Sequence, residues 1–96
     1  MKPSEALTSH REDIRRVAQE NRTCNPRVFG SVIHGVDTDD SDLDILVDPT
    51  PETTLLDIAR IQNRLQKILG VSVDVLTPRA IPQKFRDIVL REAVLI

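Results

Sequence analysis

Two short runs of branched apolar residues enclose one long amphipathic segment, and this pattern restricts the fold more than any other feature of the sequence. Residues 43–47 (LDILV) and 71–77 (VSVDVLT) are each predicted to form a strand. Between them we predict a helix capped by Thr50, with Pro51 in its first position and Gly70 as a left-handed end. The apolar stripe of this helix is predicted to comprise Leu55, Ile58, Ala59, Leu65 and Leu69, widened by Ile61 and Ile68.

The remaining segments complete an alternation of helices and strands. Apolar residues at helical spacing predict a first helix over residues 4–21, and the run RVFGSV over residues 27–32 predicts a strand that enters a tight turn at Gly30. A polar loop is expected to follow, and Phe85, Ile88, Val89 and Ala93 predict a closing helix. This order predicts a single α/β (α+β) domain over residues 1–96, with helices packed on a small mixed sheet.

Composition excludes several classes of function. The only aromatic residues are Phe29 and Phe85, and 13 basic side chains face 15 acidic ones, so direct nucleic-acid binding is not expected. No stretch approaches the ~20 apolar residues that cross a membrane, and the charged N-terminal segment does not resemble a signal peptide. Cys24 is the only cysteine and is expected to be a small buried side chain in a reducing cytoplasm.

The sequence places Gly30-Ser31 ten residues before Asp42-Leu43-Asp44. Alternate side chains of a strand share a face, so Asp42 and Asp44 can bind one Mg²⁺ ion together, although such a pair can also be a solvated strand edge. Gly30 would let the backbone approach a phosphate, and the Ser31 hydroxyl at the start of a helical turn could hold it. Taken alone, a Gly-Ser pair after a strand is more often a simple turn.

A third carboxylate lies in the second predicted strand. Asp74 stands between Val73 and Val75, and burying it there would be costly without a partner such as a cation. If the two strands that carry acids are neighbours, three carboxylates converge on one cavity. Such a site suits catalysis by two metal ions, one at the attacking oxygen and one at the triphosphate.

This spacing of Gly-Ser, Asp-x-Asp and a later Asp on a strand resembles the signature of the polymerase-β-like nucleotidyltransferase superfamily. From about residue 29 to 92 the chain is similar to the minimal members, which are short antitoxins paired with HEPN-domain toxins. The resemblance implies that Gly30 and Ser31 contact the triphosphate of ATP. It also implies that Asp42 and Asp44 hold two Mg²⁺ ions and that Asp74 completes the site beside the attacking hydroxyl.

The resemblance implies an enzyme that transfers AMP from ATP to a protein hydroxyl, a tyrosine of a cognate HEPN ribonuclease toxin, in a cytoplasmic hetero-oligomer. Two alternatives stay open: an inactive antitoxin that acts by binding alone, and a small-molecule nucleotidyltransferase, which normally needs a further substrate domain. The chain departs from the minimal members at His34, where they commonly carry Arg. Three nearby loop acids are expected to face solvent, namely Asp37, Asp39 and Asp40.

Overall fold

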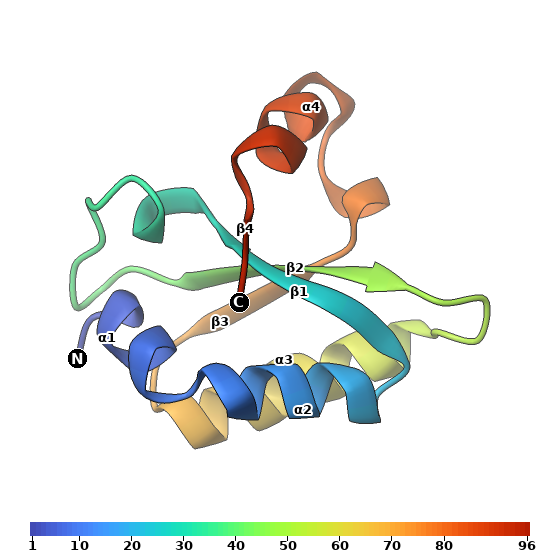
Figure 1. Cartoon of the computed structure of the whole chain (residues 1–96), viewed down its shortest axis with the longest axis horizontal. Coiled ribbons are helices and arrows are strands. Elements are labelled where there is room, and N and C mark those ends of the chain that lie inside the picture. The colour runs from blue at the N-terminus through green and yellow to red at the C-terminus, as the bar shows by residue number, and fades with distance from the viewer.

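The computed structural model describes all residues, 1–96, as a four-stranded sheet with helices on both of its sides (Figure 1). Helices α1, α2 and α3 lie on one side of the sheet and α4 lies on the other. The helices and strands are α1 (Pro3–Ser9), α2 (Arg11–Glu20), β1 (Thr23–Phe29), β2 (Leu43–Pro49), α3 (Leu55–Leu69), β3 (Val73–Leu76), α4 (Gln83–Glu92) and β4 (Val94–Leu95), with short 3₁₀ turns at Gly30–Val32 and Pro78–Ala80.

The strands are ordered β3-β2-β1-β4. Strand β1 is antiparallel to both β2 and β4, whereas β2 and β3 are parallel. A parallel pair needs a crossover connection, and α3 provides it. The mixed sheet with packed helices confirms the predicted fold class, and both predicted strands that carry acids are neighbours in the sheet.

The core lies between the sheet and helices α1 to α3. Ile61, Leu65 and Leu69 are the buried apolar residues of α3, while Leu55 is 89% exposed and Ala59 is exposed. The predicted stripe was therefore wrong at Leu55 and Ala59. The buried face follows the four-residue spacing of Ile61, Leu65 and Leu69, and both positions lie outside it. The core consists of Ala6, Leu7, Ile14, Val17, Ala18, Val28, Leu43, Ile45, Val47, Ile61, Leu65, Leu69, Val73, Val75 and Ile96.

Helix α3 begins at Leu55, so the predicted start at Thr50 and Pro51 was wrong. Thr54 is the actual cap: its hydroxyl accepts a hydrogen bond from the Asp57 amide, and its own amide donates to the Asp57 carboxylate. This reciprocal pair satisfies two amides that the helix cannot satisfy itself. Thr50 instead opens a turn in which its carbonyl accepts from the amide of Thr53. Gly70 ends the helix in the left-handed conformation, as predicted.

Both ends of the chain differ from the prediction. The first helix is interrupted at His10, whose backbone leaves the helical region (φ −130°, ψ 28°), so α1 and α2 are separate. Strand β1 begins at Thr23 and contains Pro26, which the strand accommodates through a register irregularity between Cys24 and Arg27. The closing helix ends at Glu92, and the short strand β4 that follows it was not predicted. No helix is long and apolar enough to span a bilayer.

Candidate active site

Two of the three acids predicted to share a site meet at one end of the sheet. Asp44 of β2 stands directly opposite Asp74 of β3 on one side and Phe29 of β1 on the other. Residues opposite each other on paired strands point to the same face. Apolar residues on the opposite face of β2, Leu43 and Ile45, belong to the core, so Asp44 and Asp74 lie on the face that carries α4.

Gly30 lies against the Asp44 carboxylate. The residue has a φ of +79°, and a Cβ atom placed on it would stand only 2.3 Å from Oδ2 of Asp44. Glycine is thus required here for two reasons, the backbone conformation and the space that the carboxylate occupies. From sequence, Gly30 was assigned to a tight turn and to a phosphate, and its contact with Asp44 was missed.

Ser31 lies in the 3₁₀ turn that follows β1, so the predicted helical turn is present at Gly30–Val32. The Ser31 carbonyl accepts a hydrogen bond from the Val36 amide, and the Val32 carbonyl accepts from the Gly35 amide. These bonds keep the segment folded back on itself directly after Gly30. Ser31 is half-buried and next in sequence to the residue that touches Asp44.

The three acids interact electrostatically. Burial, together with the negative charges of Asp74 and then Asp42, raises the pKa of Asp44 to about 6. Asp42 itself is exposed and precedes β2, so Asp44 and Asp74 form the close pair and Asp42 lies at its margin. No group of three or more acidic, His or Cys side chains is arranged to hold a metal ion in this structure.

An apolar cavity of about 390 Å³ adjoins Gly30, between the sheet and α4. His34 and Glu92 both line this cavity, and Nε2 of His34 is 3.2 Å from Oε2 of Glu92. The pair joins the segment after Ser31 to the last residue of α4. Sequence reasoning did not find Glu92, because nothing in the pattern of α4 shows which loop it faces. The other residues that line the cavity are Phe29, Leu76, Ile81, Pro82, Phe85, Ile88 and Val89.

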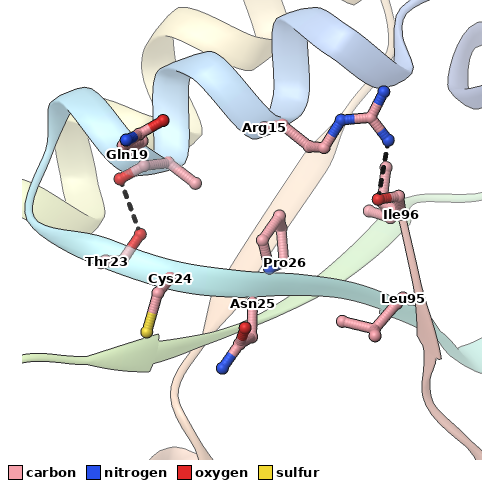
Figure 2. A pocket seen from close by; sticks show the side chains of 9 residues that line it. Arg15, Gln19, Thr23, Cys24, Asn25, Pro26, Leu95 and Ile96 are labelled. Carbon is pink, nitrogen blue, oxygen red and sulfur yellow. Dashed lines mark hydrogen bonds between the residues drawn. The ribbon is translucent and has the colours of Figure 1, made fainter.

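A second cavity, of about 340 Å³, lies between α2, β1 and β4 (Figure 2). None of its lining residues is acidic, and it contains neither Gly30 nor any of the three predicted acids. Figure 2 shows Cys24 on its rim. The thiol is exposed, so the prediction that it is buried was wrong. The alternation of β1 explains this, because Thr23 next to it is buried toward the core.

The loop acids before Asp42 are not alike. Asp39 and Asp40 are exposed, as predicted, but Asp37 is buried. Its carboxylate accepts a hydrogen bond from the Ser4 amide at 3.0 Å, and this bond lowers the pKa of Asp37. The prediction of a solvent-facing Asp37 was wrong because its partner is 33 residues away in the sequence.

Comparison with known proteins identifies the family. A family model described as a nucleotidyltransferase domain matches residues 11–96. The chain is a member of this nucleotidyltransferase family. It is 33% identical to protein adenylyltransferase MntA of Thermococcus cleftensis over 92% of this chain and 86% of that protein. It is 40% identical to a "putative protein adenylyltransferase" of Methanocaldococcus jannaschii over 70% of this chain and 72% of that protein.

A solved structure described as a "putative minimal nucleotidyltransferase" matches with a TM-score of 0.86 and 40% identity, over 97% of this chain and 95% of that one. The minimal nucleotidyltransferase recognised from the spaced motif is thereby confirmed, and the chain is an enzyme of nucleotidyl transfer. Members of the family generally use ATP and a divalent metal.

The residues of this nucleotidyltransferase fit a divalent cation. Besides burial, the negative charge of Asp74 on the adjacent strand raises the pKa of Asp44, and a cation between the two carboxylates would remove that repulsion. Mg²⁺ usually takes one or two carboxylates and completes its shell with water and substrate phosphates. The Asp44 and Asp74 pair therefore offers the hard oxygen ligands that a Mg²⁺-nucleotide complex requires.

Proposed function

We propose that this nucleotidyltransferase transfers AMP from Mg²⁺-ATP to a protein hydroxyl, a tyrosine of a cognate HEPN-domain toxin, and thereby acts as a cytoplasmic antitoxin. The observation that carries the proposal is the pairing of Asp44 with Asp74 beside Gly30. The names of the relatives support protein as the acceptor, since two of them are described as protein adenylyltransferases.

The proposed roles are those that the family resemblance implies for these residues. The backbone at Gly30 and the hydroxyl of Ser31 would bind the triphosphate, while Asp42, Asp44 and Asp74 would hold two Mg²⁺ ions. When bound, the metal would neutralise charge on the triphosphate and on the carboxylates. The acceptor oxygen bonds to the α-phosphorus, the bond from that phosphorus to the bridging oxygen breaks, and pyrophosphate leaves. Asp74 orients the acceptor hydroxyl and accepts its proton.

A macromolecular acceptor suits this chain better than a small molecule. Helices α1 to α3 and strands β1 to β3 pack in the one core, and α4 borders the cavity next to Gly30, so no helix is left to form a separate acceptor pocket beside the site. The acceptor must then contribute its own contacts, which a folded protein partner can do. We propose a hetero-oligomer with the toxin for this reason.

Mass measurement tests the proposal. The protein is incubated with Mg²⁺, ATP and a purified HEPN-domain protein from the same organism, and that protein is expected to gain mass in steps of AMP. Ser31→Ala should slow the addition without preventing association, because it removes a phosphate contact and no metal ligand. Ser9→Ala, an exposed serine of α1, is the matched control. Equal neutralisation of the toxin without ATP, with no gain of mass, would show an antitoxin that acts by binding alone.

A further inference from the structure

Strand β3, which carries Asp74, is at the edge of the sheet. Only β2 pairs with it, so one row of its backbone amides has no neighbouring strand. Successive N–H groups of a strand point to opposite edges, and those of Val73 and Val75 are on the outer side, flanking Asp74. An unpaired edge of this kind leaves a strand held by hydrogen bonds from one side only.

Two glutamine side chains of α3 take the place of the missing strand. The amide of Val73 donates to Oε1 of Gln66 and the amide of Val75 donates to Oε1 of Gln62, both at 3.1 Å. Both bonds are partly buried. Asp74 is therefore flanked on each side by a residue whose amide is bonded to a helix side chain.

The spacing of the two glutamines matches the strand. Residues four apart on a helix are separated by about 6.0 Å along its axis, and residues two apart on a strand by about 6.6 Å. Since Gln66 pairs with Val73 and Gln62 with Val75, α3 runs antiparallel to β3. Buried Ile61, Leu65 and Leu69 hold α3 on the sheet and fix the distance at which these glutamines reach the strand.

We propose that Gln62 and Gln66 are positioning residues for Asp74, an inference that rests on the proposed role of Asp74 in transfer. Their amides fix the outer edge of β3, so that the Asp74 carboxylate stays in register with Asp44. Without them β3 is bonded at one edge, and Asp74 moves relative to Asp44 and the α-phosphate. A displacement of about 1 Å at a reacting group lowers a rate by roughly 100-fold.

The test replaces both glutamines by methionine, which has a similar shape and no strong acceptor. In Gln62→Met/Gln66→Met, the amide hydrogens of Val73 and Val75 should exchange at least about tenfold faster. The kcat for AMP transfer to the HEPN-domain protein should fall by roughly 10- to 100-fold, while the KM for ATP changes less than about twofold. Gln19→Met, at an exposed glutamine of α2, is the matched control and should change neither quantity.

A double-mutant cycle separates positioning from general destabilisation. In an Asp74→Asn background the methionine substitutions should lower kcat no further, because the group they position is already absent. Single substitutions serve the same purpose if the double variant does not fold. Transfer by the unsubstituted protein with an unchanged kcat in the methionine variants would overturn this inference alone. Absence of transfer by the unsubstituted protein would overturn the proposed function, and the inference with it.

Discussion

Replacing Gly30 by alanine should damage the active site through one defined clash. The added Cβ would lie 2.3 Å from Oδ2 of Asp44, and ordinary contact begins near 3.4 Å, so the carboxylate must move by about 1.1 Å (3.4 − 2.3). Alanine at a φ of +79° also costs roughly 1 kcal/mol of stability. We expect the transfer rate to fall by roughly 100-fold, since a shift of about 1 Å at a catalytic group has that effect.

Gly35 gives a matched control for this substitution. It has a similar φ of +68° and lies in the same segment, but a Cβ placed there would meet nothing within 4 Å. Gly35→Ala should therefore show the loss of stability that comes from the backbone conformation, measured as a lower melting temperature, with little loss of transfer. The two variants are compared by thermal unfolding and by calorimetric titration with Mg²⁺-ATP alongside the transfer assay. Transfer rates in Gly30→Ala and Gly35→Ala that agree within about twofold would refute the role assigned to the Gly30 contact.

Three further predictions follow from the acids. The folded pKa of Asp44 is raised to about 6, so its protonated form stabilises the metal-free fold below about pH 4, and this stabilisation is lost as the pH rises through 6. Asp44→Asn should therefore flatten the dependence of the melting temperature on pH, measured in EDTA. The same variant should abolish transfer. Asp74→Asn should lower the transfer rate much more than the calorimetric affinity for Mg²⁺-ATP, and equal losses would make Asp74 a plain nucleotide ligand. Asp37 has a lowered pKa, so it stabilises the fold above about pH 4 and ceases to do so in more acidic solution; Asp37→Ala should lower the melting temperature at pH 7 more than Asp39→Ala, and similar effects would exclude the bond to Ser4 as the cause.

Local patterns predicted the parts of the fold that local physics determines. Branched residues around Asp44 and the alternation around Asp74 were sufficient to predict the two strands, and Gly70 marked the end of α3. The close pairing of Asp44 with Asp74 depends on β2 and β3 being neighbours in register, which the path of α3 decides. Sequence could therefore propose that the acids meet, whereas only the sheet shows which two are paired.

The incorrect predictions have two causes. Two residues can carry the same local signal for a helix cap, and some contacts join residues that are far apart in the sequence. Thr50 and Thr54 can each cap a helix, and Thr54 is the cap because Asp57 stands three residues after it and returns the hydrogen bond. Asp37 reads as a loop acid unless its distant partner Ser4 is known. Strand β4 is too short to give a periodic pattern, and it forms only by pairing with β1 from the other end of the chain.

The two glutamines of α3 that bond to β3 also affect the tendency of this protein to aggregate at high concentration. An open strand edge is a template on which another chain can add a strand, and this is a common start of aggregation. At β3 the outward amides of Val73 and Val75 are already occupied by Gln66 and Gln62, so an incoming strand would find those donors taken. The opposite edge, β4, offers only the two residues Val94–Leu95, too few to define a register with a second chain. A sheet with one edge capped and the other this short resists growth into fibrils.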